Sequence, residues 1–222
     1  MELILCIETS TKSCSVSLSE NGKSLQTIEL VSDQYSHSEK LTLFIEQILQ
    51  EQQKSFSDLD AVAVSKGPGS YTGLRIGVST AKGICYAIDK PLISISTLEA
   101  MAYGMMSKYP NAIYCPMLDA RRMEVYCAFY GNIKIDIEAK VLDENSFKEE
   151  LDKNTIIFFG DGSQKFKEII NHSNALFVAD IFPSANNMTA LAQLAFNQNK
   201  FEDLAYFEPF YLKDFVAGPQ KK

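Results

Sequence analysis

The chain has 222 residues, of which 46% are hydrophobic and 22% charged, a composition that excludes a disordered or collagen-like protein. Its length suits one large domain or two smaller ones of about 100 residues each. A net charge of −7 without a compensating basic stripe opposes direct binding to a nucleic-acid backbone.

The N-terminal residues begin directly with a strand-like run and show neither a signal-peptide pattern nor an apolar stretch long enough to span a membrane. The sequence therefore predicts a cytoplasmic protein. Its five cysteines form no C-x-x-C pair, and their odd number argues against a disulfide framework. Neither His37 nor His172 has another histidine or a cysteine at ligand spacing, so we expect no metal site.

Three strands open the chain. Leu3–Glu8 is an apolar run typical of a buried strand, and residues 14–18 alternate as in a strand with one face inside. Asn21-Gly22 is a strong hairpin signal, and it leads into a third strand at Ser24–Val31. These patterns predict an antiparallel meander.

A helix follows the meander. Ser36 and Glu39 match a capping box, which predicts that the helix begins here and ends near Gln52. Its apolar stripe, which we expect to face the core, consists of Leu41, Phe44, Ile45, Ile48 and Leu49. Leu43 lies off this stripe.

The clearest local signal is a strand, a glycine loop and a helix in succession. The strand Ala61–Val64 is short, apolar and β-branched, and the helix begins near Thr72, with Ser70 or Thr72 as its cap. A strand at Pro91–Ser96 and a helix at Thr97–Lys108 complete the first half of the chain.

The glycine loop matches neither nucleotide fingerprint. Its spacing, Gly67-x-Gly69-x-x-x-Gly73, is one residue off the dinucleotide motif, and Leu74-Arg75 replaces the Lys-Ser/Thr pair of a P-loop. This favours a simple strand-to-helix turn. A second interpretation stays open, because backbone N–H groups at a helix N-terminus attract anions. The candidate residues of such an anion or nucleotide loop are Glu8, Thr9, Ser10, Lys66, Gly67, Gly69 and Arg75.

The second half has a similar order of elements. Its predicted elements are strands at Ile113–Leu118, Val125–Tyr130 and Thr155–Phe159, a turn at Asp119–Arg122, a hairpin at Gly131-Asn132, a helix ending at Ile170 and a helix at Asn187–Gln198. We therefore divide the chain into a first lobe, residues 1–108, and a degenerate second lobe, residues 109–222. Two successive ribonuclease H-like halves predict the duplicated two-lobed α/β fold of the actin, hexokinase and acetate kinase superfamily, which binds nucleotide between its lobes.

The charged turn of the second half has two interpretations. Its residues are Asp119, Arg121, Arg122 and Glu124. Clustered opposite charges on a hairpin are usually a solvated salt-bridge network that contributes little to stability. Because arginine forks suit carboxylates and phosphates, a role in orienting the two halves or in meeting a partner is the alternative.

Several motifs resemble the TsaB family, formerly called YeaZ. They are Glu8-Thr-Ser-Thr, His37-Ser-Glu39, Lys66–Gly77 with Ala81-Lys-Gly83, Asp119–Arg122 with Glu124-Val-Tyr126, and Pro209-x-Tyr-Leu-Lys213. They occur in order along most of the chain. The resemblance implies an accessory subunit of bacterial tRNA threonylcarbamoyladenosine synthesis.

The same resemblance implies a scaffold with no catalytic residues of its own. Its paralogue TsaD would transfer the threonylcarbamoyl group as a heterodimer with it, TsaE would be the ATPase partner, and tRNA would be met only through the complex. The family can pair with itself when the partner is absent, so the resemblance leaves open whether the isolated chain is a homodimer or a monomer. The resemblance implies no resident cofactor and leaves open a nucleotide at the partner interface. TsaD-like catalysts hold their metal with His-x-x-x-His on the first helix, whereas His37 is followed here by Leu41.

Two enzyme classes remain as alternatives. For a glycoprotease-like peptidase the catalytic motifs are missing, because the sequence contains neither His-Glu-x-x-His nor Gly-x-Ser-x-Gly. An ATP-dependent phosphotransferase of the same superfamily usually has aspartate at the end of the first strand, where this chain has Glu8. A carboxylate satisfied by nearby hydroxyls and amides is the simpler interpretation of Glu8.

The helix that begins at Thr72 has two rows of apolar and small residues that could each be buried. One row suits its own sheet and consists of Leu74, Val78, Ala81 and Cys85, and the second consists of Gly73, Ile76, Gly77, Thr80 and Ile84. Together with Leu43, the second row predicts an apolar patch that binds a partner, and the resemblance points to the same two helices. The alternative is that Ile76 and Ile84 pack under the first helix.

Overall fold

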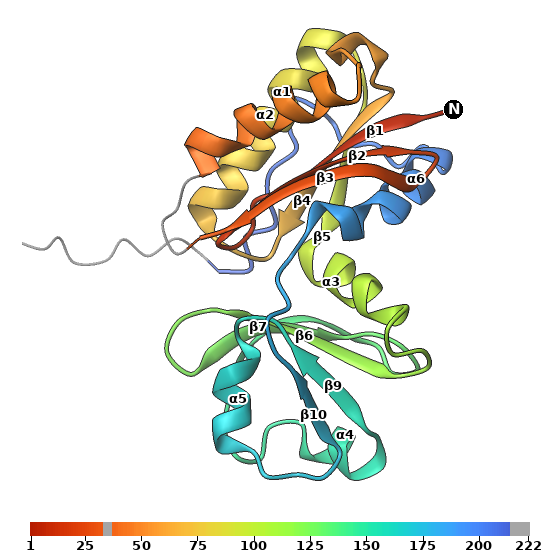
Figure 1. The fold of residues 1–222 in the computed structure, drawn as a ribbon. Helices are drawn as coiled ribbons and strands as arrows, with labels where there is room; N and C mark the ends of the chain where they lie inside the picture. Colours follow the sequence, from red (N-terminus) through yellow and green to blue (C-terminus); the bar gives the residue numbers. More distant parts are fainter. Residues whose placement is uncertain (33–36, 214–222) are drawn as a thin grey trace, which may run out of the picture.

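A computed structural model describes residues 1–32 and 37–213 of the chain. They form two lobes, each built on one five-stranded sheet (Figure 1). The capping box predicted at Ser36 involves a residue outside these ranges. Within them, no helix combines the length and the hydropathy that crossing a membrane requires.

The first lobe has the predicted order of elements. They are β1 (Leu3–Glu8), β2 (Ser13–Glu20), β3 (Lys23–Val31), α1 (His37–Glu51), a short helix η1 (Phe56–Asp58), β4 (Ala61–Gly67), α2 (Tyr71–Ile88), β5 (Leu92–Ser96) and α3 (Thr97–Met106). The sheet order is β3-β2-β1-β4-β5, with β1 antiparallel to β2 and parallel to β4. The three antiparallel strands therefore form a meander, and helices connect the parallel ones.

The second lobe repeats this topology with shorter elements. They are β6 (Ile113–Asp119), β7 (Glu124–Phe129), β8 (Ile135–Val141), α4 (Lys148–Lys153), β9 (Ile156–Phe159), α5 (Ser163–Ile169) and β10 (Ala175–Val178). The order β8-β7-β6-β9-β10 matches that of the first sheet strand by strand. Sequence analysis did not identify β8, which is partly polar, or α4 and β10, which have only six and four residues.

The last elements return to the first lobe, which corrects the predicted division at residue 109. The short helix η2 (Ala185–Met188) and α6 (Thr189–Asn197) pack against the face of the first sheet that points away from α1 and α2. In Figure 1 the blue α6 lies beside the red and orange strands of this sheet. The second lobe is thus a segment inserted before the first lobe is complete.

The central strands of the first sheet are covered on both faces, which explains their continuous apolar runs. In β1, Leu5 and Ile7 contact the core beneath α1 and α2, whereas Ile4 and Cys6 contact the core beneath η2 and α6. The serines of β2 are buried on this second side as well, contrary to the predicted strand with one face inside. The backbone N–H of Ala185 donates to Ser15 Oγ at 3.0 Å, so this polar face binds η2.

The glycines of α2 are required by the turn that follows β1. A Cβ atom at Gly73 would lie 2.1 Å from the Thr9 carbonyl oxygen, and one at Gly77 would lie 2.2 Å from Thr9 Oγ1. Thr9 Oγ1 donates to the Gly73 carbonyl at 2.8 Å. Gly73 and Gly77 are buried, so their assignment to a partner surface was wrong: the bare side of the helix lets its own chain approach.

A pair of alanine substitutions tests this contact. Gly73→Ala should lower the free energy of unfolding by about 3 kcal/mol, because the new methyl group overlaps buried backbone. Gly83 lies on the same helix with no atom within 4 Å of an added Cβ, so Gly83→Ala should raise stability by about 0.5–1 kcal/mol. Urea denaturation of both variants measures the difference, and equal effects would contradict the packing.

Candidate functional site

The turn after β1 holds a buried carboxylate. Glu8 Oε1 accepts a hydrogen bond from the Ser10 backbone N–H at 2.5 Å and another from Ser65 Oγ at 3.0 Å. Glu8 has no exposed surface, and burial raises the pKa of its carboxyl group even though these hydrogen bonds act in the opposite direction. The interpretation of Glu8 as a carboxylate satisfied by its neighbours therefore holds for Oε1, whereas Oε2 is buried without a hydrogen-bond partner in the described ranges.

The glycine loop is filled by neighbouring backbone. The Ser70 N–H donates to the Ser10 carbonyl at 2.6 Å, and a Cβ at Gly69 would lie 2.3 Å from the same carbonyl oxygen. On its other side, the Phe210 N–H donates to the Lys66 carbonyl at 2.7 Å. Because the amide of the N-cap residue Ser70 is used by Ser10 and the amide of Gly73 by the Ser70 hydroxyl, this loop offers a phosphate little of the usual helix N-terminal cradle.

The predicted anion-loop residues fall into two groups. Glu8, Thr9, Ser10 and Gly69 lie together where the β1 turn meets the loop, whereas the backbone of Lys66 and Gly67 lies beside Phe210 of the C-terminal segment. The guanidinium of Arg75 instead lies over the Tyr71 ring at 4.3 Å, and its Nε donates to the Tyr211 hydroxyl at 3.1 Å. Arg75 therefore belongs to an aromatic cluster with the C-terminal segment.

A cavity of about 580 Å³ lies between the lobes beside this turn. The first lobe contributes Ser10 and Lys12 to its wall, and the second lobe contributes Asp119, Arg121 and Asp161. Burial raises the pKa of the Asp161 carboxyl group, which accepts a hydrogen bond from the Asp119 N–H at 2.9 Å. The wall thus has charges of both signs, unlike a purely basic phosphate site.

The charged turn between β6 and β7 connects the lobes. Lys165 pairs with Asp119 at 2.8 Å within the second lobe. Lys213, in the C-terminal segment that follows α6, pairs with Glu124. The second pair supports the interpretation that this turn orients the two halves.

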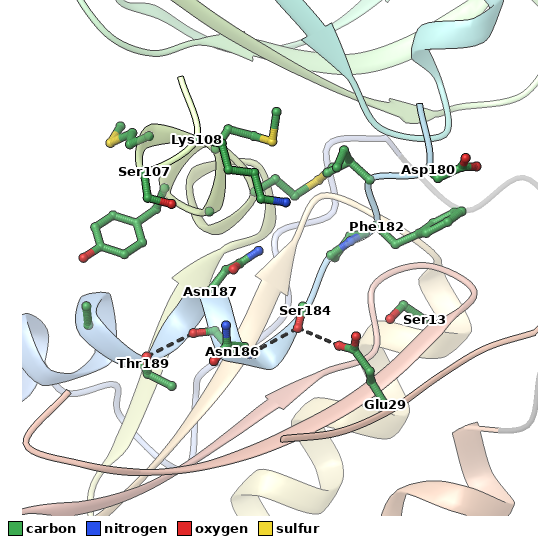
Figure 2. A pocket seen from close by; sticks show the side chains of 18 of the residues that line it. Ser13, Glu29, Ser107, Lys108, Asp180, Phe182, Ser184, Asn186, Asn187 and Thr189 are labelled. Atoms are coloured by element: carbon green, nitrogen blue, oxygen red, sulfur yellow. Dashed lines mark hydrogen bonds between the residues drawn. The ribbon is translucent and has the colours of Figure 1, made fainter. Parts of the chain in front are cut away.

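A second cavity, of about 780 Å³, was not predicted from the sequence (Figure 2). It lies between the two chain crossings that join the lobes, which are residues 101–108 and 180–190. Figure 2 shows Lys108 and Asn187 pointing into it, with Ser184 donating to Glu29 at 2.7 Å below them. No local motif marks this cavity, because its walls come from segments far apart in the sequence.

The ring of His37 is bound by the chain's own backbone. Its Nε2 lies 2.7 Å from the Thr11 carbonyl oxygen, which can only accept, so Nε2 carries a proton and cannot bind a metal. Burial lowers the pKa of this imidazole, and Leu41 is buried one turn further along α1. Across the described ranges, no group of three His, Cys, Asp or Glu side chains has the arrangement of a metal site.

The outer surface of α1 and α2 combines exposed apolar and small residues. Leu43 is 54% exposed, whereas Ile76 and Ile84 are half-buried against the core that α1 covers, as the alternative interpretation predicted. Thr80 is also half-buried. We call this surface the α1–α2 face; it consists of Leu43, Ile76, Ser79, Thr80, Gly83 and Ala87. The small exposed residues of α2 are therefore Ser79, Gly83 and Ala87. They lie on a different side of the helix from the buried Gly73 and Gly77.

Comparisons with known proteins agree with the fold and the motifs. Residues 31–220 match the family described as TsaD, tRNA N6-adenosine threonylcarbamoyltransferase. The Escherichia coli tRNA threonylcarbamoyladenosine biosynthesis protein TsaB is 31% identical over 224 residues, with 96% of each chain covered. The structure of YeaZ from Pseudomonas aeruginosa has a TM-score of 0.81 and 25% identity, covering 96% of this chain and 100% of that one.

A more distant structural similarity concerns the fold alone. Inorganic polyphosphate/ATP-glucomannokinase from Arthrobacter has a TM-score of 0.50 at 11% identity, covering 89% of this chain and 100% of that one. The predicted duplicated two-lobed α/β fold is thereby confirmed. Motifs, topology and the full-length similarity to TsaB together show that the chain belongs to the TsaB (YeaZ) family.

Proposed function

We propose that this protein is a non-catalytic, cytoplasmic subunit of tRNA threonylcarbamoyladenosine synthesis. It forms a heterodimer with the catalytic paralogue TsaD through the α1–α2 face, helps to recruit TsaE, and pairs with a second copy of itself when TsaD is absent. The curated relatives named TsaB support the pathway. The observation that carries the partner role is the α1–α2 face, where Leu43 of α1 is exposed and α2, which packs against α1, has open space at Gly83.

The competing enzyme functions lack support in the residues of this chain. A TsaD-like transferase would need a second histidine one turn after His37, where Leu41 is buried instead. A phosphotransferase would need a carboxylate that magnesium-nucleotide can reach, whereas Glu8 has no exposed surface and its Oε1 is bound by Ser10 and Ser65. A peptidase would need an activated nucleophile, for which the sequence has no motif.

Reconstitution with each subunit omitted tests the proposal. We expect threonylcarbamoyl transfer to tRNA only when this protein, TsaD and TsaE of the same organism are combined, and none from this protein without TsaD. Sustained transfer or peptide cleavage by this protein alone would overturn the non-catalytic role.

Substitutions on the α1–α2 face test where TsaD binds. Leu43→Glu should weaken heterodimer formation by about 2 kcal/mol or more, because it places an unpaired charge in an apolar interface. Gly83→Arg should act in the same direction by filling the open space on α2. Leu194→Glu is the matched control, since Leu194 is also 54% exposed but lies on α6, on the opposite face of the first sheet. Normal binding by both face variants would place the interface elsewhere.

Calorimetry with magnesium-ATP tests the state of the nucleotide cleft. We expect weak or undetectable binding by the isolated protein, because the glycine loop is filled by Ser10 and Phe210. A dissociation constant in the low micromolar range would show that the cleft between the lobes is a working nucleotide site.

The pH dependence of stability tests the structural role of Glu8. Its pKa in the folded protein is raised above the ordinary value of 4.5, so the native state binds this proton more tightly than the unfolded chain does. Stability should therefore decline as the pH rises above 4.5 towards the folded pKa. Glu8→Gln cannot ionise and should lose this decline while still supporting transfer with TsaD. Identical declines in both proteins, measured by urea denaturation, would assign the titration to another group.

A further inference from the structure

The C-terminal segment, residues 202–213, is fixed to the first lobe where it follows α6. The Glu202 N–H donates to the Leu92 carbonyl at 2.9 Å, which pairs the segment with β5 at the edge of the first sheet. From α2, Lys82 Nζ donates to the Ala205 carbonyl at 3.2 Å. The beginning of the segment therefore belongs to the first lobe.

The end of the C-terminal segment lies against the glycine loop and the start of α2. The Phe210 N–H donates to the Lys66 carbonyl at 2.7 Å. The ring of Tyr211 lies 4.9 Å from the Tyr71 ring, and its hydroxyl accepts from Arg75 Nε at 3.1 Å. Phe210 and Tyr211 both line the cavity of about 580 Å³ between the lobes. The segment thus forms part of the wall of this cavity.

Two lysines join the lobes at the same cavity. Lys213, in the C-terminal segment, pairs with Glu124 at the start of β7. Lys12, in the turn between β1 and β2, lies near Asp161 of the second lobe: burial raises the pKa of the Asp161 carboxyl group, and the positive charge of Lys12 acts in the opposite direction. Lys12, Asp161 and Lys213 all line the cavity. Two contacts between a lysine and a carboxylate therefore connect its two sides.

The chain itself crosses between the lobes at the other cavity. Both crossings, residues 101–108 and 180–190, line the cavity of about 780 Å³, and none of their residues belongs to the described wall of the smaller one. The lobes are thus joined by the chain at one cavity and by side chains at the other. This arrangement lets two packed bodies turn about the crossings as about a hinge when the side-chain contacts break.

The side-chain contacts are of a kind that breaks easily. The side chains of Lys213 and Glu124 are 47% and 18% exposed. An ion pair with an exposed partner contributes little free energy and is screened by salt. Each sheet forms its strand pairs within its own lobe, so the lobes can separate at the smaller cavity without unfolding either sheet.

We propose that the C-terminal segment is a releasable clamp that fixes the angle between the lobes and closes the cavity of about 580 Å³. When the pair between Lys213 and Glu124 is broken, the lobes turn about the two crossings and the cavity opens. Tyr211 is a positioning residue: held by Tyr71 and Arg75, it places Lys213 beside Glu124. The clamp concerns the chain alone and goes beyond the proposed function.

Distance measurements between spin labels on the two lobes test the clamp. All five cysteines are buried, so Gln50→Cys on α1 and Glu149→Cys on α4, both at exposed positions, provide the reactive thiols of the full-length protein. Pulsed electron paramagnetic resonance should give one narrow distance for the labelled protein. Lys213→Glu should raise the population at altered distances by roughly 2-fold to 5-fold, because like charges then face each other. Lys90→Glu is the matched control, since Lys90 pairs with Asp60 within the first lobe.

A charge exchange and a pair of tyrosine variants decide the outcome. Lys213→Glu combined with Glu124→Lys should restore the narrow distance, because the pair is rebuilt with its charges reversed. Tyr211→Ala should open the lobes with an unchanged circular dichroism spectrum, whereas Tyr211→Phe, which keeps the ring against Tyr71, should open them less. Native distances in both Lys213→Glu and Tyr211→Ala, or no restoration by the charge exchange, would overturn the clamp and leave the proposed function untouched.

Discussion

The close approach of the β1 turn to α2 is the contact on which the first lobe depends. Thr9 and Ser10 lie against bare backbone at Gly69, Gly73 and Gly77, at distances that no side chain would allow. This approach sets the height of α2 above the sheet. It therefore determines which side of the helix is buried, where the α1–α2 face begins, and how the C-terminal segment can run along the other flank through Phe210.

The same contact explains why a fold shared with a sugar kinase need not act as one. Where the turn after the first strand and the glycine loop remain apart, their amides can face a phosphate group. Here Ser70 donates to Ser10, and Glu8 is bound by Ser10 and Ser65 behind it. Two buried polar atoms of the turn, Glu8 Oε2 and Ser10 Oγ, nonetheless have no hydrogen-bond partner within the described part of the chain, so the chain uses part of the hydrogen-bonding capacity of the turn and not all of it.

Sequence analysis predicted most of the fold because its local signals were strong. Apolar runs such as Leu3–Glu8, the hairpin at Asn21-Gly22 and the strand–loop–helix segment all describe interactions between residues close in sequence. The prediction failed where one pattern fits two environments. Glycines at helical spacing indicate a close contact with the helix, but they do not distinguish Thr9 of the same chain from a partner subunit. Likewise, the alternating serines of β2 give the same sequence pattern whether their face of the sheet is exposed to solvent or covered by η2. The larger cavity could not be predicted from the sequence, because the segments that line it are far apart in the chain and come together only in the folded structure.

The return of α6 to the first sheet has a consequence for how the protein is made. During synthesis from the N-terminus, β1, β4 and β5 emerge with Ile4, Cys6 and Ile93 uncovered, because Met188 and Ala192, which cover them, follow only after the whole second lobe. The inserted second lobe, from β6 to β10, forms all its strand pairs within a continuous segment and can fold in the meantime. The lobe that leaves the ribosome first is thus the last to complete its fold. Until then, the uncovered apolar face of its sheet is accessible to chaperones and to other nascent chains.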